Sequence, residues 1–275
     1  VGAKERRRPG PLRGRGSVLF EHGSLRSRSL EHRSRGAVAG LGDRSRRRAV
    51  VLMSATVVTE RDLATLRWVA EQYAVPMRVL AGLITQDAAR SVQDALSPSS
   101  AEVMARRQAA RLERLGYADR RPMLGQTWLS PTRRGMTAAG LPYRLWVIED
   151  HAWSLAHVEA CARLRLQLER AYPTATWESD RAIRHRWWRS GARVRLADGG
   201  LYWSDDGSAT GIELERHVKR PDRYRAAVLD TDPAWTAGVW WFCPAGQVEL
   251  LTARLREAGG GELHQVYELL EGVSP

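Results

Sequence analysis

The chain has 275 residues, of which 43% are apolar, and this is enough for two modest globular domains. No stretch approaches the roughly 18 consecutive apolar residues of a membrane span. No apolar segment follows the basic N-terminus as it would in a signal peptide, so we expect a cytoplasmic protein without a membrane partner. The two cysteines, Cys161 and Cys243, are too far apart for a CxxC zinc site and are expected to be buried as small hydrophobic residues.

The basic excess of the chain lies mainly at its N-terminus. Residues 1–49 carry 14 basic and 4 acidic side chains, and they lack any apolar period. This composition predicts disorder for residues 1–52. One interpretation is a basic arm that follows DNA phosphates without sequence preference. The other, which we favour, is an upstream reading frame rather than native protein, since Met53 stands directly before the first predicted helix.

Three helices followed by a hairpin are predicted over residues 57–140. Thr59 and Asp62 have the spacing of a capping-box variant at the start of the first helix. A short helix over MRVLAGLI follows, and the third runs over about residues 100–115. Two extended runs then meet at a turn containing Gly125. This order of elements is typical of a winged helix-turn-helix domain.

The third predicted helix has an apolar side and an opposite, strongly basic side. Ala105, Ala109 and Leu112 fall on the packing side when residues are placed at 100° intervals. In a winged helix this helix would lie in the major groove and the wing along the backbone, so we predict duplex DNA as the partner. The alternatives are an ordinary solvated surface and a winged helix that docks another protein. The predicted DNA-contacting residues are Arg106, Arg107, Arg111 and Arg114 on the helix, and Arg120, Arg121, Arg133 and Arg134 at the wing.

An α/β domain with a mixed sheet is predicted over residues 150–272, which makes the chain α/β, or α+β overall. A long helix, HAWSLAHVEACARLRLQLERAYP, comes first. Glu159 lies within its apolar stripe, where a carboxylate needs a partner. Helix, strand, helix and strand end the domain. Between them and the long helix we expect three strands, over residues 175–187, 191–205 and 208–219.

Acidic residues lie on both arms of a hairpin predicted within residues 198–219, DGGLYWSDDGSATGIELERHVK. If Asp205–Ser208 form the loop, Asp198 lies opposite Glu215 and Glu213 lies on the diagonal. Side chains in these positions share one face of the sheet and stand about 5 to 8 Å apart. The three carboxylates could therefore converge on one hard cation, Mg²⁺ or Mn²⁺.

Other residues extend this acidic row. The same strand face continues to His217 and Lys219, and Glu159 from the preceding helix could complete the cluster. Two alternatives stay open: the Asp198–Gly199 pair is also typical of a turn, and an alternating charged face is also the ordinary solvated side of a sheet. A loop longer or shorter by one residue would move Asp198 to the other face.

Histidines and tryptophans give weaker signals. His151, His157, His185, His217 and His264 show no HExxH or comparable metal-binding spacing, and we interpret most of them as structural. Four tryptophans could stack on exposed bases, but their positions beside predicted strands favour core packing. They are Trp187, Trp188, Trp240 and Trp241.

Several segments between Val58 and Gly272 resemble one known family. They are TERDLATLRWVAE, LERLGYADR, WLSPTRRG, LAHVEA, LADGGL and IELERHVKRPDRYR. The chain resembles the replication-relaxation family of actinobacterial and Gram-positive plasmids and integrated elements. That family joins a winged helix to a domain similar to PD-(D/E)XK nucleases.

This resemblance implies catalytic and metal-binding roles for the acidic row. Asp198 matches the aspartate of the nuclease pattern, Glu213 the second carboxylate, and Glu215 the position where Lys usually stands. Three interpretations of this departure stay open: Glu215 acts there itself, as Glu does in some restriction-type nucleases; Lys219 substitutes for the Lys; or the site is degenerate. The implied metal ligands are Glu159, Asp198 and Glu213, and the implied cofactor is Mg²⁺ or Mn²⁺.

We therefore predict a DNA-binding protein of a plasmid or mobile element, active in replication, relaxation or transfer, with a Mg²⁺-dependent endonuclease (nickase) site. One alternative is a non-catalytic replication or relaxosome accessory factor. Another is a winged-helix transcriptional regulator whose second domain binds an effector or mediates dimerisation. The expected partners are double-stranded DNA, replication or relaxosome proteins, and a second copy of the chain in a homodimer.

Overall fold

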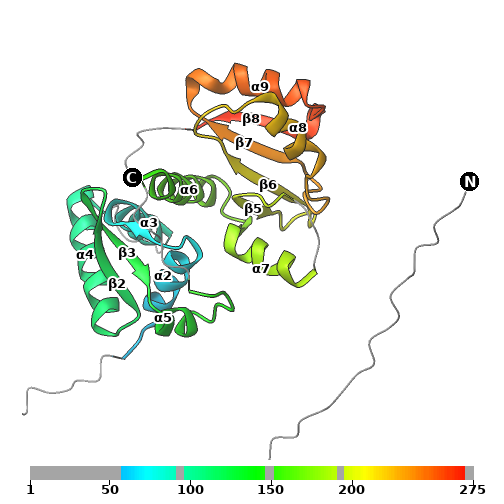
Figure 1. Cartoon of the computed structure of the whole chain (residues 1–275). Helices are drawn as coiled ribbons and strands as arrows, with labels where there is room; N and C mark the ends of the chain where they lie inside the picture. Colours follow the sequence, from blue (N-terminus) through cyan, green and yellow to red (C-terminus); the bar gives the residue numbers. More distant parts are fainter. Residues whose placement is uncertain (1–56, 91–95, 146–151, 191–194, 270–275) are drawn as a thin grey trace, which may run out of the picture. The chain divides into compact units, whose positions relative to one another are not determined.

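The computed structural model describes residues 57–90, 96–145, 152–190 and 195–269 (Figure 1). These ranges contain eight α-helices, a three-stranded antiparallel sheet and a five-stranded mixed sheet. The predicted mixed α/β class is confirmed. The predicted tail, residues 1–52, lies outside the described residues. None of the described helices is long and apolar enough to cross a membrane.

The three-stranded sheet packs against the helices that come first in the described chain. Strand β3 lies at its centre, because β2 pairs with one edge of β3 and β1 with the other. The three helices and the hairpin agree with the sequence prediction, whereas β1 was not predicted. The elements are α2 (Glu60–Glu71), β1 (Val75–Pro76), α3 (Met77–Arg90), α4 (Pro98–Arg114), β2 (Ala118–Met123), β3 (Gln126–Pro131) and α5 (Arg133–Ala138).

Local signals account for these boundaries. At the start of α2, the Thr59 backbone N–H donates to Asp62 Oδ2 at 2.8 Å, and the Asp62 N–H donates to Thr59 Oγ1 at 3.1 Å. The predicted capping box is therefore confirmed. Leu124 and Gly125 have φ values of 47° and 71°, as a tight two-residue hairpin connection requires.

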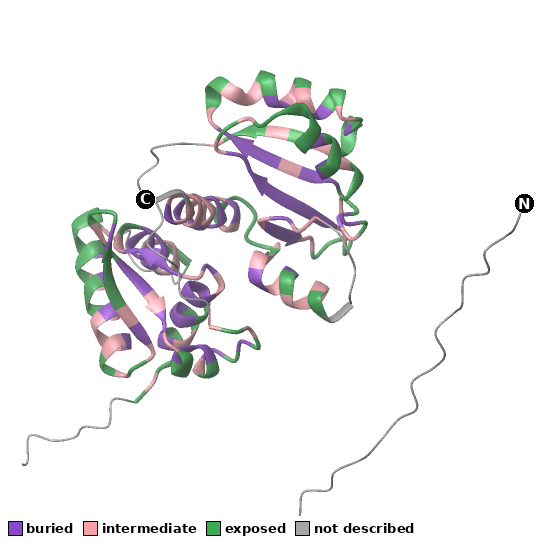
Figure 2. Cartoon of the chain, in the orientation of Figure 1, coloured by how far each residue is buried: buried purple, intermediate pink, exposed green. Residues whose placement is uncertain are grey.

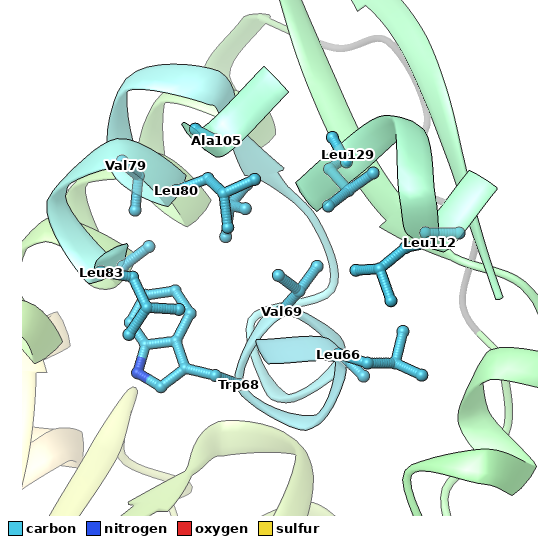
Figure 3. Close-up of a cluster of buried hydrophobic side chains, with 14 of the residues drawn as sticks. Leu66, Trp68, Val69, Val79, Leu80, Leu83, Ala105, Leu112 and Leu129 are labelled. Atoms are coloured by element: carbon cyan, nitrogen blue, oxygen red, sulfur yellow. The ribbon is translucent and has the colours of Figure 1, made fainter. Parts of the chain in front are cut away.

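Apolar side chains from α2, α3, α4 and β3 form one core (Figure 3). Each of these helices turns its apolar side inward, so their contributions meet over β3. Labelled members include Leu66, Val69, Leu80, Leu112 and Leu129, all with no exposed surface.

The larger sheet has the strand order β4-β5-β6-β7-β8. Strands β4, β5 and β6 run antiparallel, and β6, β7 and β8 run parallel. Figure 2 shows β6 and β7 almost entirely buried and the outer sides of α8 and α9 exposed. The elements are α6 (Ala152–Ala171), β4 (Thr176–Ser179), α7 (Asp180–Ser190), β5 (Gly199–Tyr202), β6 (Ala209–Leu214), α8 (Pro221–Leu229), β7 (Val239–Cys243), α9 (Val248–Glu257) and β8 (His264–Glu268).

All three predicted strands are corrected. The strand expected over residues 191–205 is β5, Gly199–Tyr202, and residues 191–194 lie outside the described residues. The strand expected over residues 175–187 ends at Ser179, whose Oγ accepts from the Ala182 N–H at 3.3 Å at the start of α7. The strand expected over residues 208–219 ends at Leu214. Beyond it, the Lys219 N–H donates to the Tyr224 hydroxyl at 2.7 Å instead of to a neighbouring strand.

Two expectations about buried side chains are also corrected. Trp241 is buried as predicted, but 81% of the Trp188 surface is exposed. Cys243 is buried in the core, whereas Cys161 is only half-buried and lies beside a histidine. The surroundings of Cys161 therefore differ from those of a purely space-filling residue.

Candidate functional site

Three of the eight arginines predicted to contact DNA, one on the outer side of α4 and two on the wing, have exposed acidic partners. Arg106 pairs with Glu102 at 2.9 Å, one turn earlier on α4. On the hairpin, Arg120 pairs with Glu113 and Arg121 with Asp119, the latter at 3.4 Å. All these pairs are substantially exposed, so they stabilise the fold little.

Arg111 does not lie on the exposed basic side where the helical wheel places it. Its Nε is 2.9 Å from both carboxylate oxygens of Asp62, and its Nη2 donates to the Val57 carbonyl at 2.6 Å. Asp62 is buried and also accepts from Gln108. Arg111 therefore neutralises a buried carboxylate between α2 and α4.

Three of the predicted arginines are exposed and have no ion-pair partner. Arg107, Arg114 and Arg133 make no side-chain hydrogen bond or ion pair with any residue that the structure describes. Arg134 lies beside them in sequence, with its guanidinium 5.1 Å from the centre of the Tyr117 ring. Among the eight predicted arginines, those without an acidic partner in the described part of the chain therefore lie on α4 and at the start of α5.

The acidic hairpin forms one residue earlier than predicted. The Trp203 N–H donates to the Ser208 carbonyl, and the Gly207 N–H donates back to the Trp203 carbonyl, so the turn is Ser204–Gly207. Gly199 pairs with Ile212, and this register continues to place Asp198 opposite Glu213 rather than Glu215. Because the partner changes by two residues, the side chains keep their faces.

Each carboxylate of the acidic row has its own partner. Asp198 accepts from the Leu214 N–H at 2.8 Å and contacts His157 Nε2 at 3.2 Å. Both oxygens of Glu213 accept from Arg195, at 2.9 and 3.0 Å. Glu215 pairs with Lys219 Nζ at 2.9 Å, although Lys219 lies beyond the end of β6 and not on a strand face.

The environment shifts the pKa values of these groups in opposite directions. Burial raises the pKa of Glu213 to about 7 despite the Arg195 hydrogen bonds, and the negative charge of Asp198 adds to the rise. Burial also acts to raise the pKa of Asp198, but the bonds from His157 and the Leu214 amide outweigh it and lower this pKa. For His157, burial lowers the pKa and Asp198 raises it more. His157 and Asp198 therefore stabilise each other's charged forms.

Glu159 does not belong to the acidic row. Its carboxylate accepts from Arg78 Nε, from Arg163 Nε at 3.0 Å and from Gln126 Nε2 at 3.2 Å. The expectation that this carboxylate needs a partner is confirmed: Arg78 on α3 and Gln126 on β3 both come from outside its own helix, and Arg78 supplies the charge.

The predicted ligand set of Glu159, Asp198 and Glu213 is therefore not assembled. In the described part of the chain, a different group brings its ligand atoms close enough for one metal ion: His157, Cys161 and Asp198, within 4.8 Å of one another. Mg²⁺ does not fit the acidic row, because a hard cation needs free oxygen ligands and Arg195 occupies both oxygens of Glu213.

Sequence reasoning missed Arg195, His157 and Cys161. Arg195 gave no distinctive signal, since arginine is common throughout the chain. His157 and Cys161 did give one: they are four residues apart on a helix and so lie on one face. That spacing could have been recognised alongside the HExxH pattern.

The chain was compared with protein-family models, with curated protein sequences and with solved structures, and none of the three comparisons gave a match. The resemblance to the replication-relaxation family therefore rests on the sequence segments quoted above.

Proposed function

We propose that the protein binds duplex DNA through α4 and the adjoining β2–β3 hairpin, in the manner of a winged helix-turn-helix domain. The observation that carries this proposal is a pair of exposed arginines on α4, Arg107 and Arg114, which have no ion-pair partner among the residues that the structure describes. The other side of this helix packs in the core. Arg133 at the start of α5 adds a third free guanidinium. Guanidinium groups are well suited to bidentate contacts with phosphates and guanine edges.

The order and pairing of the helices and strands support a winged helix-turn-helix domain. Helix, short strand, two helices and a hairpin, with β1 paired to β3, is the order expected of a winged helix. In this proposal α4 is the recognition helix. Arg120 pairs with Glu113 and Arg121 with Asp119, so in this proposal they contribute less to DNA contacts than the arginines of α4.

The proposed role is that of a non-catalytic accessory factor in replication, relaxation or transfer of a plasmid or mobile element. The family resemblance supplies this context, and a long helix, an antiparallel strand meander and a parallel β6–β7 pair are compatible with a PD-(D/E)XK-like domain. The ion pairs at Glu213 and Glu215 favour the accessory role over the nickase, because they take the place that a catalytic cation would need. Replication or relaxosome proteins are the proposed protein partners.

We expect replacement of both Arg107 and Arg114 by Ala to weaken binding to duplex DNA and to make the binding constant less dependent on salt concentration. Each lost phosphate contact lowers the slope of log K against log salt by about 0.9. The midpoint of thermal unfolding stays unchanged, since both side chains are exposed and unpaired. Fluorescence anisotropy with a labelled duplex at several salt concentrations measures both quantities.

Arg256→Ala is the matched control, because Arg256 is an exposed arginine on α9 with no described ion-pair partner. It leaves affinity and salt slope at their wild-type values. The control removes one charge and the α4 variant removes two, so a loss in the control half as large as in the α4 variant would mean that only net charge matters. This result would contradict α4 as the recognition helix.

The accessory role predicts that the full chain does not nick supercoiled plasmid in Mg²⁺ or Mn²⁺ under conditions in which it binds that plasmid. Conversion to the open-circular form is read on an agarose gel. Nicking that disappears in Glu213→Gln would reject the accessory role in favour of the nickase. Nicking that persists in that variant would indicate a contaminating nuclease, and a cleaner preparation would be required before the result counted.

A further inference from the structure

Three metal-binding residue types meet between α6 and the start of β5. His157 and Cys161 are one turn apart on α6, with Cys161 Sγ 3.4 Å from His157 Nε2. Asp198 stands directly before β5, and its Oδ1 is 3.2 Å from the same imidazole nitrogen. The Leu214 N–H holds the other oxygen, Oδ2, and so fixes the carboxylate with one oxygen directed at the cluster.

The spacing of the ligand atoms matches a tetrahedral ion. Zinc–nitrogen and zinc–oxygen bonds of about 2.0 Å and a zinc–sulfur bond of about 2.3 Å place the ligand atoms about 3.3 to 3.6 Å apart. The two contacts made by His157 Nε2 are 3.2 and 3.4 Å, and all three ligand atoms lie within 4.8 Å of one another. Two of the three spacings therefore match, and the third, between the ligand atoms of Cys161 and Asp198, is at most 4.8 Å.

The donor set selects the kind of ion. One imidazole, one thiolate and one carboxylate suit a borderline ion such as Zn²⁺, and not Mg²⁺, which prefers oxygen ligands alone. The thiolate and the carboxylate together neutralise the two positive charges of the ion. Metal binding releases two protons to solvent, the thiol proton of Cys161 and the proton on His157 Nε2, since both ligand atoms must be deprotonated.

Nearby charges also favour a cation at this place. Burial raises the pKa of the Cys161 thiol well above its ordinary value, and the carboxylates of Asp198, Asp180 and Glu213 raise it further, with Arg216 opposing them. Burial disfavours a charge of either sign, and only the negative charge of the three carboxylates favours a cation here. All three ligand residues are half-buried, which leaves a route for entry.

We propose that His157, Cys161 and Asp198 form a binding site for one Zn²⁺ ion or a similar borderline divalent ion. Three protein ligands leave the fourth tetrahedral position to water, as in zinc sites that bind a further ligand. The site is separate from α4, so the proposal does not depend on DNA binding.

Cobalt(II) is the probe, added to the full chain after removal of metals with a chelator and under reducing conditions. Wild-type protein gives a thiolate-to-cobalt charge-transfer band and the intense visible bands of tetrahedral cobalt, which saturate at one equivalent. Added Zn²⁺ abolishes them by competition. Cys161→Ser removes the charge-transfer band.

Cys243→Ser is the matched control, since Cys243 is the second of the two cysteines in the chain and lies in the core. This variant keeps the charge-transfer band. Asp198→Asn retains a thiolate band but weakens Zn²⁺ binding more than about tenfold, since even outer-sphere partners of metal ligands contribute that much. Circular dichroism establishes that each variant is folded.

Absence of a charge-transfer band in folded wild type overturns the proposal, as does a band that survives in Cys161→Ser or is lost in folded Cys243→Ser. Unchanged Zn²⁺ affinity in Asp198→Asn also overturns the three-ligand set. Duplex affinity, measured on the same preparations, stays at the wild-type value in Cys161→Ser. Failure of the zinc site and failure of DNA binding are therefore distinguishable.

Discussion

We expect replacement of Asp62 by Ala to lower the free energy of unfolding by about 3 to 5 kcal/mol. The reason is that the partly buried guanidinium of Arg111 is then left without its carboxylate partner. The same carboxylate accepts the Thr59 N–H and a bond from Gln108, so one half of the capping box is lost as well, while the bond from the backbone N–H of residue 62 to Thr59 Oγ1 stays. Chemical denaturation of both proteins, followed by circular dichroism, measures the difference.

Glu102→Gln is the control for Asp62→Ala. It breaks the exposed Arg106–Glu102 pair on α4 and costs less than about 1 kcal/mol. A comparable loss in both variants would mean that burial does not decide the strength of these pairs, contrary to the structure. Burial acts to raise the pKa of Asp62, and its hydrogen bonds lower it more. Its contribution is therefore present at neutral pH and is lost as the pH falls below the ordinary range of an aspartate.

We expect replacement of Arg195 by Met to lower the free energy of unfolding at pH 8, since Glu213 is then buried without its cation and must take up a proton. The loss is smaller at pH 5 by about 1.4 kcal/mol, because Glu213 is protonated there in both proteins and pH 8 lies about one unit above its folded pKa of about 7. The measurement is denaturant unfolding of wild type and variant at both pH values.

The sign of this pH dependence follows from the folded pKa of Glu213. It is about 7, above the value of about 4.3 for an exposed glutamate, because of burial and of the charge of Asp198, while Lys219 opposes the rise. The folded state therefore binds the proton more tightly than the unfolded state, and stability falls as the pH rises through this window. Loss of Arg195 raises the folded pKa further, so the added penalty appears at the alkaline end.

The double variant Arg195→Met with Glu213→Leu tests the cause. It removes both charges and fills the space with apolar atoms, so most of the stability lost in Arg195→Met at pH 8 is recovered. An equal loss at pH 5 and pH 8 in the single variant, or no recovery in the double variant, would show that Arg195 acts by packing on Trp241, which its guanidinium approaches to 5.6 Å.

Helix α7 shows how tertiary context overrode a local preference. The segment with Trp187 and Trp188 favours a strand, because large aromatic residues fit a pleated surface. It forms a helix because Ser179 caps its first turn and Ile183 and Arg181 turn inward, where Arg181 donates to backbone carbonyls of Ala70 and Arg144. Those acceptors are far away in sequence, so no local pattern could have revealed them.

Features that depend on residues close together in the chain could be predicted from the sequence alone. The capping box at Thr59, the hairpin at Gly125 and the alternation that places Asp198 and Glu213 on one face are all set by backbone geometry over a few residues. These features were therefore predictable from spacing, including the hairpin whose loop was misplaced by one residue.

Only the tertiary structure decided which charged groups are paired. Asp62 pairs with Arg111, which is 49 residues away in the chain. Glu213 pairs with Arg195, 18 residues away, and Glu159 pairs with Arg78, 81 residues away. The metal-binding group joins His157 to Asp198 across 41 residues. In a chain with this many arginines, composition gives every carboxylate several candidate partners, and burial selects one by making an unpaired charge too costly. For the same reason the buried carboxylates of Glu213 and Glu215 are paired with cations. Two exposed arginines of α4 have no ion-pair partner among the described residues.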